Sequence, residues 1–262
     1  MKKIAIIGHG YVGKAMEKFL QNHYELVIYD PPAGYSTTKE EVNECYATFI
    51  CVPTPRGDDG SCNLSLVEDS ISWLKTELII IKSTVEVGAT QKLSKKYNKS
   101  IVFSPEYVGE SIYWSPYKFH KDMEETPFFT FGGEKKTCSK VVDLFLPVTG
   151  PCKKYNIIDS TTAEMAKYME NCFYATKVAF CNEIYDICNA TGVDYNEARE
   201  LWLSDPRLNP MHTAVFKDNR GFGGKCFPKD ISALVNIAEK TNTKSILLKS
   251  VIESNKHVRK NN

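Results

Sequence analysis

The chain has 262 residues, a net charge of +1, 25% charged and 42% hydrophobic residues, a composition that is ordinary for a globular protein. This length is enough to bury one large or two smaller hydrophobic cores. The balanced charge argues against nucleic acid as a main partner, because a surface that follows phosphates usually shows a basic excess.

Nine cysteines are spread along the chain, and none forms a Cys-x-x-Cys pair. No histidine cluster has ligand spacing, so no metal site is expected. The odd cysteine count and the lack of a recognisable secretory leader predict reduced thiols in a cytoplasmic protein. No apolar run reaches membrane-spanning length, so no membrane partner is expected.

From residue 1 to about 157, short apolar runs alternate with helical patterns. The predicted strands are 3–8, 26–30, 47–52, 78–82, 101–104, 128–131 and one near 155–158. The predicted helices between them are 13–22, 64–76, 90–97 and 136–146. Apolar strands joined by helical crossovers predict an α/β fold of the Rossmann type, in which a mostly parallel sheet is covered on both faces.

After residue 157 the pattern becomes helical. A capping-box pattern at Thr161–Glu164 predicts the start of a long helix that Gly192 ends. A second such pattern at Asp194–Glu197 predicts a helix that ends near Pro206. A glycine-rich loop and two further helices follow, at 221–224, 228–240 and 245–259. We therefore predict a Rossmann domain at 1–157 and an all-helical domain at 158–262.

A Gly-x-Gly-x-x-Gly motif, formed by Gly8, Gly10 and Gly13, lies between the first predicted strand and helix. Such glycines permit a tight turn, close approach of the backbone to a pyrophosphate, and packing of helix on strand. A turn that merely joins strand to helix is the alternative. Asp30 ends the second predicted strand, where an acid binds ribose hydroxyls and repels a 2′-phosphate. The pattern predicts binding of NAD rather than NADP.

Two features further along the chain suggest catalysis. Cys226 precedes Pro228, a residue suited to the first turn of a helix, and has lysines on both sides. A helix N-terminus and cations favour the reactive thiolate, although a small buried cysteine is the alternative. Lys167 and Asn171 share one face of the long helix. On its own, that pair is more simply interpreted as a solvated stripe than as part of a cleft.

Seven segments occur in an order and spacing that resembles the UDP-glucose/GDP-mannose dehydrogenase family, over essentially the whole chain. They are Gly8–Gly13, Cys51–Pro55, Lys82–Val85, Ser104–Glu106, Glu164–Asn171, Asn182–Glu183 and Gly221–Asp230. The resemblance implies NAD as the cofactor and a four-electron oxidation of a nucleotide sugar at C6, with UDP-glucose to UDP-glucuronate as the first expectation. It also implies that a cysteine thiolate adds to the aldehyde and that water hydrolyses the resulting thioester.

The resemblance implies roles for particular residues. Cys226 would be the nucleophile, Lys167 would stabilise charge on the reacting oxygen, and Asn171 would hold the sugar. Asp230 and Thr84 would position or activate water. The full implied catalytic set is Cys226, Lys167, Asn171, Asp230, Thr84 and Glu110.

Binding residues follow from the same resemblance. Those for the cofactor are Gly8, Gly10, Tyr11, Val12, Gly13, Asp30, Val52, Pro53, Thr54, Thr84, Glu110 and Lys229. Those for the substrate are Glu106, Glu110, Lys167, Asn171, Arg207, Gly223 and Cys226. Arg207 resembles an arginine that reaches the neighbouring subunit's substrate, and the long helix resembles a dimer core. A homodimer is therefore expected.

Family members usually continue with a second Rossmann-like domain that grips the nucleotide, and this chain ends at Asn262, about where that domain would begin. Two other functions remain possible on the sequence. A two-electron hydroxyacid dehydrogenase shares the Rossmann domain and the Lys-x-x-x-Asn pair, but needs no thiol such as Cys226. A non-catalytic NAD-binding module is the other alternative, and the retention of the whole catalytic set weighs against it.

Overall fold

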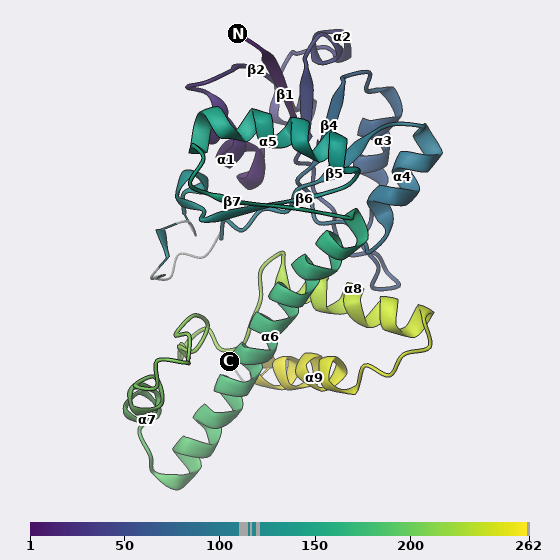
Figure 1. The fold of residues 1–262 in the computed structure, drawn as a ribbon. Helices are drawn as coiled ribbons and strands as arrows, with labels where there is room; N and C mark the ends of the chain where they lie inside the picture. Colours follow the sequence, from purple (N-terminus) through teal and green to yellow (C-terminus); the bar gives the residue numbers. More distant parts are fainter. Residues whose placement is uncertain (110–114, 116, 119–120, 261–262) are drawn as a thin grey trace. The chain divides into compact units, whose positions relative to one another are not determined.

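The computed structural model describes residues 1–109, 115, 117–118 and 121–260. Its contacts divide the chain into two compact units (Figure 1). Unit 1 comprises Met1–Thr54 and Asn63–Lys167, and unit 2 comprises Pro55–Cys62 and Tyr168–Asn262. The division falls inside the long helix, and the assignment of domains at 1–157 and 158–262 stays a prediction.

Unit 1 is built on a seven-stranded sheet in the order β2-β1-β3-β4-β5-β6-β7. The strands are β1 (Lys3–Ile7), β2 (Glu25–Tyr29), β3 (Ala47–Ile50), β4 (Leu78–Ile81), β5 (Ile101–Phe103), β6 (Phe128–Gly132) and β7 (Lys154–Ile158). Neighbouring strands are parallel, except that β5 and β6 are antiparallel. This confirms the predicted Rossmann-type sheet. The strand order reverses at β1 and β3, and such sheets bind ligands at the carboxyl ends of the strands at this switch point.

Helices cover both faces of the sheet. They are α1 (Tyr11–Leu20), α2 (Lys39–Asn43), α3 (Ser65–Trp73), α4 (Ala89–Tyr97) and α5 (Lys135–Thr149), with short 3-10 turns η1 (Pro31–Ala33) and η3 (Met123–Glu125). α1 and α5 pack on one face, and α2, α3 and α4 on the other. Successive side chains of β1 point to opposite faces of the sheet. Ile4 and Ile6 therefore enter one core, and Ala5 and Ile7 enter the other.

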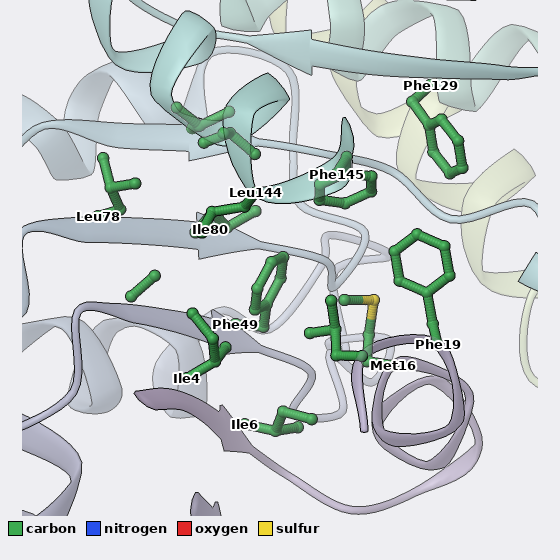
Figure 2. Close-up of a cluster of buried hydrophobic side chains, with 14 of the residues drawn as sticks. Ile4, Ile6, Met16, Phe19, Phe49, Leu78, Ile80, Phe129, Leu144 and Phe145 are labelled. Carbon is green, nitrogen blue, oxygen red and sulfur yellow. The ribbon is translucent and has the colours of Figure 1, made fainter. Parts of the chain in front are cut away.

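The core beneath α1 and α5 is rich in aromatic rings, and Figure 2 shows how they gather. Phe19 of α1 lies 5.2 Å from Phe145 of α5, and Phe145 lies 5.0 Å from Phe129 of β6, measured between ring centroids. Such tilted and edge-on pairs are favourable arrangements for buried rings. They fix α1, and with it the glycine loop that precedes this helix, against the sheet.

Unit 2 is helical. The long helix α6 (Ser160–Thr191) starts in unit 1, and α7 (Tyr195–Trp202), α8 (Phe227–Lys240) and α9 (Ile246–Lys260) follow it. Ala175 and Ala179 of α6 share a core with Ile231 of α8 and Val251 of α9. No helix in the described part of the chain combines the length and the apolar character needed to cross a membrane.

The predicted capping box at Thr161–Glu164 is wrong. α6 begins at Ser160, and Asp159 binds its first turn. The backbone N–H and the hydroxyl of Thr162 donate to the two oxygens of the Asp159 carboxylate, at 2.9 and 2.6 Å. Glu164 is buried and bonds to the N-terminus of α4. The side chain that the local pattern assigned to the cap of α6 therefore makes a tertiary contact.

Two other helices also differ from the sequence-based expectation. The second predicted cap is present, since Asp194 accepts from the backbone N–H of Asn196 and Glu197, but α7 ends at Trp202 instead of near Pro206. The short helix α2 was not predicted at all. Its signal was in the sequence: Thr38 and Glu41 form a reciprocal capping box.

Candidate functional site

The glycine loop has the geometry of a phosphate cradle. Gly8 follows β1 with φ of +85°, and a Cβ atom there would lie 2.9 Å from the carbonyl carbon and oxygen of Cys51. A Cβ at Gly13 would lie 2.1 Å from the carbonyl oxygen of Gly8. Gly10 is the N-cap of α1, and a Cβ there would meet no described atom within 4 Å. Packing therefore requires Gly8 and Gly13, whereas Gly10 leaves the helix N-terminus open to a pyrophosphate, as NAD requires.

Asp30 follows β2, next to this loop. Its Oδ2 accepts a hydrogen bond of 2.6 Å from the backbone N–H of His9, so the carboxylate is held against the glycine motif. The eight residues after it, 31–38, contain no lysine or arginine. An acid at this position and the lack of a nearby cation in this segment favour the ribose hydroxyls of NAD over the 2′-phosphate of NADP.

The predicted cofactor residues after β3 and β4 lie on loops that are bonded to each other. The hydroxyl of Thr54 donates to the carbonyl of Thr84 at 2.8 Å, and the hydroxyl of Ser83 donates to the carbonyl of Val52 at 2.6 Å. Pro53 lies between Val52 and Thr54. These loops extend the carboxyl-end surface from β1 across β3 to β4.

The first turn of α1 contains two further predicted cofactor residues, Tyr11 and Val12. The hydroxyl of Tyr11 donates to the carbonyl of Gly109 at 2.5 Å. The side chain of Val12 is partly buried and packs against the same core as Phe19. Glu110, which follows Gly109, lies outside the described residues.

A buried lysine cluster lies beyond β4 and β5. The Lys82 ammonium is buried, 3.4 Å from the hydroxyl of Ser104 and 3.3 Å from the carbonyl of Pro105. Burial lowers the pKa of Lys82 to about 8, and the nearby Glu106 carboxylate opposes this effect. Lys167 is close enough to lower the pKa of Lys82 further.

Lys167 itself is 7% exposed, and its ammonium lies 4.7 Å from the centroid of the Tyr107 ring. Such a contact is favourable for a cation with little water around it. Lys167 is therefore not part of a solvated stripe. Together with Lys82 it creates positive potential near Glu106, which suits the stabilisation of negative charge on an oxygen.

In unit 2, Cys226 is the N-cap of α8 and is exposed, so the buried-cysteine alternative does not describe it. Asp230, one turn into α8, is fully buried. Its carboxylate accepts from the side-chain amide of Asn171 and from the Lys229 ammonium, each at 2.5 Å. Gly223 lies in the exposed loop before Cys226. The structure thus brings Asn171 and Lys229 to the Asp230 carboxylate, one turn after Cys226 in α8.

Arg207 lies apart from that helix in the sequence, after α7. Its side chain is 87% exposed, and its guanidinium binds the carboxylate of Asp205. An exposed arginine of this kind is available to a ligand or a second chain. In the described part of the chain, no group of three or more His, Cys, Asp or Glu side chains is arranged to hold a metal ion.

Two residues that hold the loop before Cys226, Asn255 and Asn182, were not among the predicted site residues. The Asn255 side chain accepts from the N–H of Phe222 at 2.7 Å and donates to its carbonyl at 2.9 Å. Asn182 Oδ1 accepts from the N–H of Gly221 at 3.1 Å and from Arg220 at 3.2 Å. Asn182 lies in one of the seven segments of resemblance, whereas no local pattern points to Asn255.

Residues 16–149 match the family model described as the NAD binding domain of the UDP-glucose/GDP-mannose dehydrogenase family, and residues 161–257 match its central domain. The chain belongs to this family. The match confirms the prediction of NAD as the cofactor.

Among curated members of this family, the chain is similar to UDP-glucose 6-dehydrogenase YwqF of Bacillus subtilis, with 34% identity over 79% of this chain and 48% of the relative. It is 32% identical to the UDP-glucose 6-dehydrogenase of Rickettsia bellii, over 83% of this chain and 50% of the relative. The chain spans about half the length of these curated relatives.

Solved structures share the fold. A UDP-glucose dehydrogenase from Pyrobaculum islandicum superposes with a TM-score of 0.84 at 24% identity, over 98% of this chain and 68% of that one. A 3-hydroxyisobutyrate dehydrogenase from Mycobacterium tuberculosis gives a TM-score of 0.71 at 16% identity, over 97% of this chain and 92% of that one. At these identities the likeness shows the fold alone.

Proposed function

We propose that this protein oxidises a nucleotide sugar at C6 from alcohol to acid with NAD, and that UDP-glucose is the first substrate to test. The observation that carries the proposal is the surroundings of Cys226. Cys226, at the N-cap position of α8, has an exposed thiol, and the buried Asp230 carboxylate one turn further along binds Asn171 and Lys229. Oxidation of an alcohol only to a carbonyl requires no thiol, whereas oxidation through a thioester does.

When bound, NAD supplies an acceptor for the hydride that leaves C6 in each of the two oxidations. The Cys226 thiolate adds to the C6 aldehyde and forms a carbon–sulfur bond. Loss of the second hydride and of the hydroxyl proton leaves a thioester. Water then adds, the carbon–sulfur bond breaks, and the thiol is recovered together with a carboxylic acid. In this scheme Lys167 stabilises the negative charge that develops on the C6 oxygen.

The other predicted residues take supporting roles. Asp230 orients the Asn171 amide and the Lys229 ammonium through its two carboxylate oxygens, and we assign the sugar to Asn171 and the cofactor to Lys229. Asp230 and Thr84 position the hydrolytic water. Glu106, Glu110, Arg207 and Gly223 complete the proposed sugar-binding set.

Further proposals concern the whole protein. We assign cofactor binding to residues 1–157 and dimer formation to 158–262, and we propose a cytoplasmic homodimer with a nucleotide sugar as its substrate. The names of the curated relatives support UDP-glucose. A two-electron oxidation is the alternative, and the exposed Cys226 argues against it.

The stoichiometry of NADH decides between these functions. With NAD and UDP-glucose, we expect two NADH and one uronic acid for each sugar consumed. Cys226→Ala should abolish acid formation and leave NAD binding unchanged. Cys226→Ser should nearly abolish it, because an alkoxide is much harder to form near neutral pH than a thiolate. Cys152→Ala, at the other exposed cysteine, is the matched control and should keep full activity.

Each contrary result has a meaning. One NADH per sugar would support the two-electron alternative. Tight NAD binding without turnover of any nucleotide sugar would support a non-catalytic module. Acid formation by Cys226→Ala at the rate of the unmodified protein would overturn the assignment of the nucleophile.

A further inference from the structure

The side chain of His9, inside the glycine motif, is 8% exposed and bonded on both ring nitrogens. Its Nε2 lies 2.7 Å from Oε2 of Glu17, and its Nδ1 lies 2.8 Å from the hydroxyl of Tyr35. Glu17 belongs to α1, and Tyr35 follows the η1 turn after β2. The imidazole of His9 therefore connects α1, the helix that follows the glycine loop, with the segment that follows Asp30.

The backbone of His9 makes a second connection to the same segment. Its N–H donates to Oδ2 of Asp30 at 2.6 Å. The carbonyl of Asp30 accepts from the N–H of Ala33 at 2.9 Å and of Tyr35 at 3.3 Å, so the segment from Asp30 to Tyr35 is a closed turn. His9 holds this turn at both ends, by its backbone at Asp30 and by its ring at Tyr35.

A neutral imidazole satisfies both ring contacts. If the Tyr35 hydroxyl donates to Nδ1, then Nε2 carries the proton and donates to the Glu17 carboxylate. Both ring nitrogens are thus used in contacts within the protein. The arrangement also places the His9 and Tyr35 rings edge to face, with centroids 5.1 Å apart.

We propose that His9 is a positioning residue for the adenosine half of NAD, and that it sets the preference for NAD over NADP. The proposal rests on the proposed function only through NAD binding, not through oxidation of a sugar. An acid at the end of β2 accepts ribose hydroxyls and repels a 2′-phosphate only while its carboxylate is held at the ribose. A turn that is no longer fixed can move that carboxylate away, which weakens NAD binding and reduces the penalty for NADP.

Binding measured without any sugar tests this directly. Dissociation constants for NAD and NADP are measured by calorimetric titration for the unmodified protein and for His9→Ala, Tyr35→Phe and the double variant. We expect His9→Ala to bind NAD about 10-fold more weakly and Tyr35→Phe about threefold more weakly, as for the loss of one or two hydrogen bonds. NADP binding should change by less than about twofold in both. The double variant should be no weaker than His9→Ala, because both changes break one connection.

Two further variants provide references. Asp30→Ala should also narrow the ratio between the two cofactors, because it removes the acid that His9 positions. His23→Ala, at an exposed histidine in the turn after α1, should bind both cofactors as the unmodified protein does. Tyr35 is 36% exposed, and removal of its hydroxyl keeps the fold, so Tyr35→Phe decides the question even if His9→Ala fails to fold.

The proposal is overturned if Tyr35→Phe binds NAD as tightly as the unmodified protein. It is also overturned if His9→Ala loses the same factor for NAD and NADP, because that result describes general support of the loop. Failure to oxidise any sugar would contradict the proposed function but would leave this binding test unaffected. The two proposals can therefore fail separately.

Discussion

Lys82 carries an ammonium group in surroundings that disfavour a charge. A lysine that is 2% exposed has lost most of its hydration, which disfavours the ammonium form. The groups that face it are the Glu106 carboxylate, which favours the charged form, and the Lys167 ammonium and Cys51 thiol. With a pKa of about 8, Lys82 is still mostly protonated at neutral pH. The protein thus keeps two cations together beside one carboxylate, at the carboxyl end of the sheet.

This burial predicts a pH dependence of stability. The pKa of Lys82 is about 8 in the folded protein against an ordinary value of 10.5, so between these values the unfolded chain binds more protons than the folded one. The free energy of unfolding should therefore rise with pH across this window, since the cost of burying the charge disappears. Relative to Lys82→Met, the gain should be on the order of 2 kcal/mol as pH rises from neutral towards 10.

Urea unfolding of both proteins at several pH values measures this difference, and the comparison cancels the titration of other groups. Lys136→Met, at an exposed lysine of α5, serves as the control and should differ from the unmodified protein by a constant amount. A difference for Lys82→Met that is flat over this pH range would show that Lys82 keeps its ordinary pKa.

At the scale of helices, Glu164 joins two elements that are far apart in the sequence. It lies in the first turns of α6, and its carboxylate accepts from the backbone N–H of Gly88 at 2.5 Å and of Thr90 at 2.9 Å. These N–H groups belong to the N-terminus of α4, where Gly88 has no side chain with which to cap the helix. A carboxylate is also favoured there by the helix dipole. Glu164 thus replaces a local cap.

Removal of this carboxylate should be costly. Glu164→Ala leaves two backbone donors without their acceptor in a buried place, and we expect the free energy of unfolding to fall by about 2 kcal/mol or more. Glu164→Gln keeps one acceptor and should be intermediate. Glu183→Ala, at an exposed glutamate of the same helix, should cost less than about 0.5 kcal/mol. Equal stability of the Glu164→Ala and Glu183→Ala variants in urea would contradict this role.

The same helices show what the sequence could predict. Short apolar runs separated by helical patterns, the glycine motif and the positions of Asp30 and Cys226 can all be read locally. The fold class and the start of α8 were therefore predicted from them. The cap of α6 was predicted wrongly because Glu164 fits a local pattern but bonds across the fold. The contacts of Asn255 and Lys82 could not be predicted either, because each depends on a partner that only the folded chain brings near.

At the scale of the whole molecule, α6 carries an unusual surface in unit 2. Four large apolar side chains on this helix are more than half exposed: Met169, Phe173, Phe180 and Ile187. The last three are seven residues apart, a spacing that keeps them on one side of a helix. Phe180 also packs against Trp202 of α7, and both line an apolar hollow between the two helices. A stripe of exposed apolar side chains of this kind is typical of a surface that another chain covers.

We therefore expect a homodimer that forms through this stripe. Light scattering at micromolar concentration should give twice the chain mass. Replacing both Phe173 and Phe180 with glutamate should shift the protein to a monomer, because the charged groups would have to lose water in the interface. The dissociation constant of the dimer should rise by at least about 100-fold. Ile246→Glu, at a residue of α9 that is 71% exposed, is the matched control and should remain a dimer.

If the unmodified protein is a monomer with and without NAD, the stripe has another partner and the homodimer is wrong. If Ile246→Glu dissociates the dimer as strongly as the double variant, the interface lies on α9 and not on α6.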